Sequence, residues 1–203
     1  MTQDENDNLD RLIDAMLDMA AADGWATVTR DAVALRAGVS VPDAAALVAD
    51  RGQLLDAYAR RVDAAACVDA QAGADPAARY DELLDILMRR FETLQTHRAA
   101  VVRLIREVPA DPKTMLRCLP QSQRSFASLA GAAGYPDKGI GGAVFAKALS
   151  IVWLATQRDW LRDDTPDLAP TMASLDRNLG RAIDLVGAVC PLGRAWARQP
   201  DEA

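Results

Sequence analysis

Residues 29–55 read TRDAVALRAGVSVPDAAALVADRGQLL, and this stretch predicts a helix, a tight turn and a second helix. Thr29 can cap the first helix, and Gly38 supplies the left-handed residue that ends it. Ser40 can then cap the second helix, where Asp43 follows three residues later as in a capping box and Pro42 is tolerated in the first turn. A helix, a glycine-containing turn and a second helix form the DNA-reading motif of many repressors. We expect Val33, Leu35 and Ala37 to face inward from the first helix.

The longer stretch DRLIDAMLDMAAADGWATVTRDAVALRAGVS, residues 10–40, resembles the amino-terminal domain of the tetracycline-repressor (TetR) family. It has an amphipathic first helix, a break at Gly24 and the run AGVS at the turn. The resemblance implies a helix-turn-helix domain over residues 1–52 and a helical ligand-binding and dimerisation domain over 53–203. It also implies that DNA would be contacted from the following positions: Thr29, Arg30, Ser40, Val41, Asp43 and Arg51.

The recognition helix departs from the pattern of the resembled family. That family carries a small or basic start, a Thr, a Tyr and an aromatic end, and then a Lys near the start of the fourth helix. Here the corresponding residues are Val41, Pro42, Asp43, Ala45, Val48 and Arg51. Of these, Arg51 is the one that can hold a phosphate, so we expect Arg51→Ala to weaken any DNA binding uniformly across sequences.

Charge is unevenly distributed along the chain. Residues 1–52 contain ten acidic and four basic side chains, a net charge of −6, whereas the remaining 151 residues carry 19 of each sign. Because lysines and arginines that displace counterions provide most non-specific affinity for DNA, this domain should be repelled by DNA at long range. DNA is therefore a doubtful partner on charge, although a few well-placed arginines could still bind it.

Length, composition and cysteine content exclude several classes of protein. At 203 residues and 50% hydrophobic content, the chain can bury a sizeable core. The most apolar stretches are interrupted by residues such as Lys147 and Arg158, so we expect a cytoplasmic protein with no transmembrane segment. Cys67, Cys118 and Cys190 are far apart and His97 is the single histidine. We therefore expect buried reduced thiols, a surface or helix-end histidine, no metal site, no cofactor and no enzymatic activity of its own.

Apolar residues recur at helical spacing along most of the chain, and no segment alternates with period two. The sequence therefore predicts an all-α fold of about nine helices. After the helix-turn-helix, we expect helices at the following places: Arg51 to the break at Gly73–Pro76, Tyr80–Phe91, His97–Glu107, Met115–Leu129 with a kink at Pro120, Ile140–Arg162 and Asp167–Val189.

Two sets of apolar residues are candidates for binding. The first lies on three middle helices expected to surround one centre, and it is either a filled core or a cavity for an elongated or flat apolar molecule. Its members are Met88, Phe91, Leu104, Met115, Leu119, Phe126 and Leu129. The second lies on the last two helices, which pair with a second subunit as a four-helix bundle in the resembled family. Its members are Phe145, Trp153, Met172, Leu175, Leu179 and Ile183.

The carboxy-terminal phrase WLRDDTPDLAPTMASLDRNLGRA, residues 160–182, is similar to the end of the lipid-binding accessory proteins of ubiquinone biosynthesis. That resemblance implies a TetR-like shape without evident use of the DNA-reading domain. Two hypotheses follow: a TetR-type transcription regulator controlled by a small apolar ligand, or a lipid- or quinone-binding protein that no longer binds DNA. In both, the chain is expected to form a homodimer.

Overall fold

The computed structural model describes Thr2–Val189, and in this part of the chain it contains nine α-helices and no strand. The all-α prediction is confirmed, while Cys190 and the residues after it lie outside the described part. The helices are α1 (Gln3–Asp23), α2 (Arg30–Ala37), α3 (Val41–Leu47), α4 (Arg51–Ala66), α5 (Pro76–Thr96), α6 (Arg98–Glu107), α7 (Pro112–Ala132), α8 (Gly139–Trp160) and α9 (Ala169–Val189), with short 3-10 turns at Trp25–Thr27 and Val108–Ala110.

Helix boundaries follow the predicted signals except at the end of α4. α4 ends at Ala66 rather than near Gly73, and Asp69 beyond it takes a left-handed backbone conformation that a continuing helix does not allow. α7 contains Pro120 in its interior, as the sequence predicted, and the kink at that proline stays a prediction.

The chain divides into two compact units. Unit 1 contains the residues up to Val62 together with Leu94–Gln121, and unit 2 contains Asp63–Thr93 together with the residues from Ser122 onward. The predicted boundary after residue 52 does not coincide with this division. Unit 1 also includes α6 and the first half of α7, which lie more than forty residues further along the chain, and α6 packs on α1 and on the turn Trp25–Thr27.

The helix-turn-helix of unit 1 forms through local capping. The Thr29 hydroxyl accepts from the amide of Ala32 at 3.2 Å, and Gly38 has φ +64°, the left-handed conformation that ends α2. The Ser40 hydroxyl accepts from the amide of Asp43 at 3.2 Å and donates to its carboxylate at 2.5 Å. The Asp43 carboxylate thus bonds to the Ser40 hydroxyl, where a capping box would have it accept from the Ser40 amide.

One residue of α2 lies on the side opposite to the predicted one. Val33 is buried as expected, but Leu35 is 82% exposed and Ala34 takes the inward position. The reason is the packing of α1, which contacts both α2 and α3 and covers the side of α2 that carries Val33 and Ala34. Arg11 of α1 also donates to the carbonyl of Ala37 at 2.5 Å, which ties α1 to the turn.

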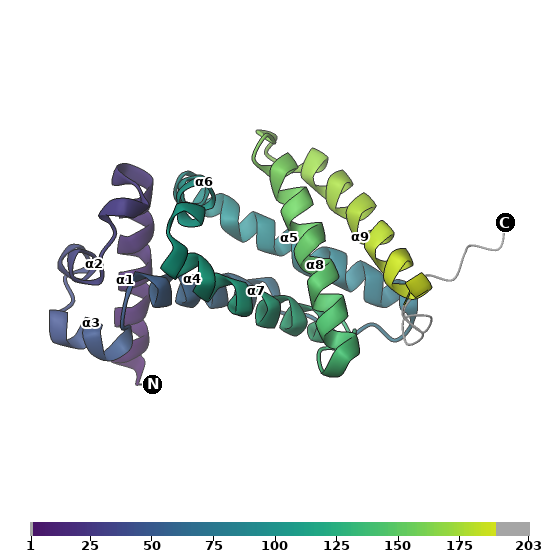
Figure 1. Cartoon of the computed structure of the whole chain (residues 1–203), viewed down its shortest axis with the longest axis horizontal. Helices are drawn as coiled ribbons and strands as arrows, with labels where there is room; N and C mark the ends of the chain where they lie inside the picture. Colours follow the sequence, from purple (N-terminus) through teal and green to yellow (C-terminus); the bar gives the residue numbers. More distant parts are fainter. Residues whose placement is uncertain (1, 190–203) are drawn as a thin grey trace. The chain divides into compact units, whose positions relative to one another are not determined.

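The main packing contact of unit 2 is between α8 and α9, which lie side by side in Figure 1. Their facing sides carry large apolar residues that are almost completely buried: Phe145, Leu149, Trp160, Leu175, Leu179 and Ile183. Tyr80 of α5 donates a hydrogen bond to the Asp176 carboxylate of α9 at 2.6 Å, which adds α5 to this pair.

α8 is apolar around most of its circumference. By length and composition it is the one helix in the described part that could cross a bilayer, with a mean hydropathy of 1.5 over its most apolar window, although the sequence predicted no such segment. Lys147 does interrupt the stretch, but a single charge leaves the average high. One such helix is weak evidence for a membrane span, because a helix that packs on a neighbour with one side and on a partner with the other has the same composition.

The turn between α8 and α9 is organised by a buried carboxylate. Asp163 accepts from the amides and hydroxyls of both Thr165 and Thr171, at distances of 2.6 to 3.0 Å. Burial alone would raise the pKa of Asp163, but these four hydrogen bonds outweigh it and lower the pKa to about 2. The DDTPD segment that the sequence identified as a helix stop therefore depends on the ionised form of its first residue.

We expect Asp163→Asn to lower the free energy of unfolding by about 2 kcal/mol at neutral pH, because a neutral amide cannot accept all four bonds. The folded pKa lies below the unfolded value of about 3.9, so the ionised group stabilises the fold above that pH and its contribution disappears as the pH falls toward 2. Urea unfolding of both proteins between pH 7 and pH 2 measures the effect. The difference in the free energy of unfolding between the two proteins should vanish near pH 2. Asp184→Asn, a change of an exposed carboxylate, is the control and should leave the free energy of unfolding unchanged at every pH.

Candidate functional site

The outward side of α3, which reads DNA in a helix-turn-helix, carries little that can recognise a base. Its exposed residues are Val41, Pro42, Asp43, Ala45 and Ala46. Four of these side chains are apolar, and none of the five carries a hydrogen-bond donor when Asp43 is ionised. Asp43 could accept from a cytosine amino group, but its carboxylate already accepts from the Ser40 hydroxyl.

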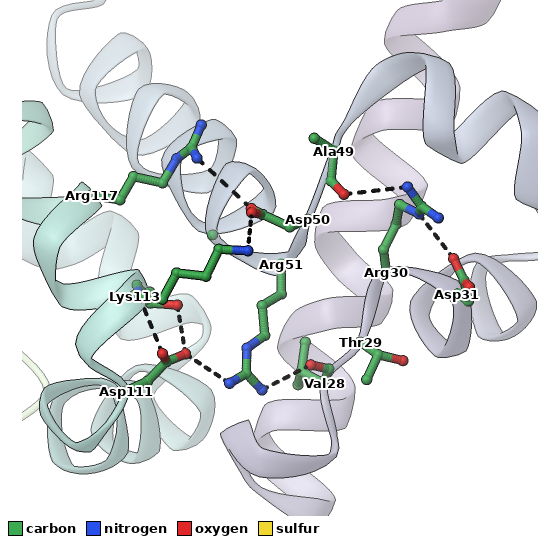
Figure 2. Close-up of a pocket in the computed structure, with 12 residues that line it drawn as sticks. Val28, Thr29, Arg30, Asp31, Ala49, Asp50, Arg51, Asp111, Lys113 and Arg117 are labelled. Atoms are coloured by element: carbon green, nitrogen blue, oxygen red, sulfur yellow. Dashed lines mark hydrogen bonds and ion pairs between the residues drawn. The ribbon is translucent and has the colours of Figure 1, made fainter.

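Arg51, the predicted phosphate contact, has a different role in the structure. Its guanidinium donates to the carbonyls of Trp25 and Val28 at 2.9 and 3.1 Å and to the carboxylate of Asp111 at 2.7 Å. It also lies over the indole ring of Trp25, 4.9 Å from the ring centre. Figure 2 shows the side chain pointing between Val28 and Asp111. Two of its nitrogens already bond inside unit 1, so Arg51 has a structural role there, and its contact with phosphate stays a prediction.

Asp111 is the centre of this junction. Besides Arg51, it accepts from the amide and hydroxyl of Thr114, where it caps α7, and from the indole nitrogen of Trp25. The Thr114 hydroxyl bond is the largest influence on the pKa of Asp111, which these bonds together hold well below its ordinary range despite burial. The start of α4, the turn after α1 and the start of α7 are thus joined through one ionised carboxylate.

A second group of ion pairs lies beside the first. Asp50 accepts from Lys113 at 3.0 Å, and Arg117 lies 3.9 Å from Asp50 and 2.6 Å from Asp56. Burial tends to raise the pKa of Asp50, but Lys113, the Gln53 amide and Arg117 together lower it. Asp50, Lys113 and Arg117 line a cleft of about 420 Å³ within unit 1 together with Arg51 and Asp111 (Figure 2). Its cations and carboxylates alternate, so the cleft is close to neutral.

The other predicted DNA contacts on α2 are also engaged within unit 1. Arg30 pairs with Asp31 at 2.9 Å and donates to the carbonyl of Ala49 at 3.3 Å, as Figure 2 shows. The Thr29 hydroxyl caps α2. Among the arginines of the first 52 residues, Arg36 is exposed to solvent, whereas Arg11, like Arg30 and Arg51, donates to internal acceptors.

The predicted ligand-binding residues divide between the two units. Met115 and Leu119 of α7 belong to unit 1 and are exposed, while Leu104 of α6 is buried there. Met88, Phe91, Phe126 and Leu129 are buried in unit 2. Met88 also lines a groove of about 400 Å³ together with Met172 and five carboxylates, so the surroundings of this groove are acidic rather than apolar.

The aromatic members of this set meet around Trp153. Phe91 stacks on Trp153 with ring centres 4.0 Å apart. The ring centre of Phe126 lies 6.0 Å from that of Trp153, and these two rings are tilted relative to each other. The guanidinium of Arg90 lies 4.3 Å from the centre of Trp153 and pairs with Asp63 at 2.9 Å. Trp153 therefore occupies the centre between Phe91 and Phe126, which supports a filled core over a cavity at this point.

Most of the predicted interface residues point into unit 2. Phe145, Trp153, Leu175, Leu179 and Ile183 are at most 8% exposed, because α8 and α9 pack these side chains against each other and against α5. Side chains buried in this way within one chain expose little surface to a second subunit, and the interface at these five residues stays a prediction. Met172, the sixth, is 47% exposed.

Two cysteines, Cys67 and Cys118, and the histidine lie in the described part of the chain. Burial raises the pKa of the Cys67 thiol, and the nearby charge of Asp63 raises it further. Burial and the charge of Asp56 raise the pKa of the Cys118 thiol in the same way. Both are partly buried, and His97 precedes α6 as its N-cap residue, at a helix end as predicted. Within the described residues, no group of three or more His, Cys, Asp or Glu side chains is placed to hold a metal ion.

Sequence reasoning missed Asp111, Lys113 and Arg117. The run ADPKT, residues 110–114, contains the signal that would have found one of them, because an Asp before Pro with Thr three residues later is typical of a helix N-cap. Nothing local indicates that the same carboxylate accepts from Arg51, sixty residues earlier.

The fold is similar to that of solved transcriptional regulators of the TetR type. One, from Nitrosomonas europaea, superposes with a TM-score of 0.61 at 19% sequence identity, over 86% of this chain and 97% of that one. Another, from Streptomyces coelicolor, gives 0.58 at 18% identity, over 94% of this chain and 86% of that one. No protein-family model and no curated protein matches the sequence. At these identities the likeness establishes a TetR-like fold.

We expect Arg51→Ala to destabilise unit 1 by about 2–3 kcal/mol, since it removes three hydrogen bonds, one of them to a partly buried carboxylate. Arg36→Ala, a change of an exposed arginine nearby, should shift stability by less than about 0.5 kcal/mol. Thermal unfolding followed by circular dichroism compares the two. Equal midpoints for both variants would contradict the structural role of Arg51.

Proposed function

We propose that this chain is a homodimeric regulatory protein with a TetR-like fold whose helix-turn-helix does not read the base sequence of DNA. The observation that carries the proposal is the exposed side of α3. Direct readout requires side chains that bond to base edges in the major groove, most often Arg, Lys, Asn or Gln. The five exposed residues of α3 include none of these types.

Electrostatics supports the same conclusion. A protein that binds DNA without reading bases still needs cations that displace counterions from phosphates. In this chain the first 52 residues carry a net charge of −6, and three of their four arginines donate to carbonyls or carboxylates of unit 1. Acidic side chains thus outnumber the arginines that could contact phosphate, and most of these arginines already bond within unit 1.

The exposed side of α8 supports a homodimer through a set of residues other than the predicted one. Ile140, Val144, Ile151 and Leu154 are all exposed, and with Lys147 and Arg158 they recur at alternating spacings of four and three residues. This is the spacing of a helix that packs lengthwise on another helix. Four large apolar residues on one exposed stripe are best explained by a second copy that covers them, as in two-fold symmetric dimers.

A second candidate function is the binding of an apolar molecule, such as a lipid or quinone, by unit 2. The observation in its favour is that Phe91 and Phe126 converge in one place, around Trp153. A ligand there would have to displace the Trp153 ring from its stack on Phe91. A lipid or quinone that co-purifies with the chain in native mass spectrometry would favour this function.

DNA binding provides the direct test of the first proposal. We expect the chain to give the same weak or absent shift with its own upstream DNA and with a scrambled duplex of equal length. Ala45→Arg should add non-specific affinity and steepen the salt dependence by about one unit, because it places one cation on the exposed side of α3. Ala45→Glu is the matched control and should add none. A salt-resistant shift with the upstream DNA alone would refute the proposal.

The dimer makes a separate prediction. Ile151→Glu and Leu154→Glu should convert the dimer to folded monomers, because both side chains are more than half exposed in one protomer and become buried between two. Leu179→Glu should instead unfold unit 2, since Leu179 is completely buried. Sedimentation velocity and circular dichroism measure both outcomes. A dimer that survives the changes at Ile151 and Leu154 would assign the interface to another surface.

A further inference from the structure

The outward side of α2 and α3 forms an apolar surface that contributes nothing to the core of unit 1. Leu35 is 82% exposed and Val41 is 44% exposed, although both are large apolar residues. α2 ends at Ala37 and α3 begins at Val41, so a turn of three residues joins the two helices, which lie next to each other in Figure 1. We call this surface the head face and define it by Leu35, Val41, Pro42, Ala45 and Ala46.

The stability of unit 1 does not require these residues to be apolar. The inward positions of the two helices are taken by Val33, Ala34 and Ala44, each of them completely buried. An exposed leucine gains no free energy from burial in the isolated chain, and a polar residue at position 35 would fit as well. A single exposed apolar residue needs no explanation, but five of them on two adjoining helices indicate a surface that is covered in a complex.

Charge selects the kind of partner that can cover the head face. Residues 1–52 carry a net charge of −6, so the electrostatic field around this domain is negative. On the two helices themselves, Asp31 of α2 has 61% of its side chain exposed and Asp43 lies within the face, with one exposed arginine, Arg36, beside Leu35. A partner with a negative backbone, such as a nucleic acid, would be repelled, whereas a basic partner would be attracted and oriented.

We propose that the head face docks a basic amphipathic helix of a partner protein, with the apolar stripe of that helix on Leu35 and Val41 and its lysines or arginines toward Asp31 and Asp43. A helix that lays its apolar side on an apolar surface, with complementary charges at the edge, is a common mode of peptide recognition. This inference rests on the proposed function, because a helix-turn-helix that read DNA would need the same face. It gives the protein a way to regulate through another protein.

A designed peptide tests this directly on the full-length chain. The probe is a fluorescein-labelled helix of lysine and leucine in which the leucines form one stripe, and fluorescence anisotropy measures its dissociation constant. We expect binding that weakens as salt is raised. The double variant Leu35→Ser, Val41→Ser should weaken it about tenfold or more, the loss expected when apolar anchors at the centre of an interface are removed.

Three controls make the outcome specific. The same peptide with glutamate in place of lysine should not bind, and a scrambled peptide of equal composition should bind far less, because it lacks the stripe. Leu185→Ser removes an apolar residue of α9 that is 64% exposed, and it should leave the affinity unchanged. Amide chemical-shift changes on peptide addition should cluster on α2 and α3. Both changed residues are exposed, so the double variant should keep its fold, which circular dichroism verifies.

The inference is overturned if the double variant binds the peptide as tightly as the unchanged chain does, if the shift changes lie on α8, or if no binding occurs at low salt. Failure of the proposed function is detected separately, because the DNA shift assay contains no peptide and its result does not depend on peptide binding. A specific shift with upstream DNA that disappears in the Leu35→Ser, Val41→Ser variant would assign the head face to DNA and overturn both. If the unchanged chain binds neither the peptide nor its upstream DNA, the docking inference is overturned and the proposed function stands.

Discussion

The ion pair between Arg51 and Asp111 holds unit 1 together. Arg51 begins α4, Asp111 begins α7, and both bond to Trp25 in the turn after α1. Three chain segments that are far apart in sequence therefore meet at one guanidinium and one carboxylate. Removing either partner would leave the other partly buried without its counter-charge, which costs more free energy than the pair itself contributes. The helix-turn-helix is positioned by this constraint.

The same constraint limits what unit 1 can do with DNA. An arginine that donates to two carbonyls and a carboxylate has fewer donors left for a phosphate, and the pair of Arg30 with Asp31 acts in the same way. Lys113 pairs with Asp50 but keeps 81% of its side chain exposed. Two of the acidic side chains in unit 1 have a structural use at helix starts, where Asp50 caps α4 and Asp111 caps α7. A domain stabilised by its own internal ion pairs has few cations left for a polyanion.

Local sequence signals predicted the helices well because capping acts between neighbours. Thr29, Gly38 and Ser40 fix the ends of α2 and the start of α3 through bonds that span three or four residues, and the structure confirms each of them. The side on which a helix is buried depends on what packs against it, and for that the spacing of apolar residues is insufficient. Leu35 shows this in α2, where the buried side is the one that α1 covers.

α8 is the clearest case of this limit. It is apolar on two sides, so periodicity cannot tell Trp153, which stacks on Phe91 inside unit 2, from Leu154 beside it, which is exposed. The partners of a charged side chain are equally invisible in the sequence when they lie far along the chain, as with Arg51 and Asp111. Candidate sites chosen by residue type alone therefore included Arg51 and Trp153, which the structure uses to hold each unit together.

The two units share one device in their interiors. In unit 1, Arg51 lies over Trp25 and pairs with Asp111, and in unit 2, Arg90 lies over Trp153 and pairs with Asp63. Each combines a cation on an aromatic face with a partly buried carboxylate. Removing the arginine or the carboxylate leaves a partly buried charge without its counter-charge. Substitutions at these six positions are therefore costly, whereas α3 is a short helix whose one fully buried residue is Ala44. The surface of α3 can change its binding chemistry while both units keep their fold.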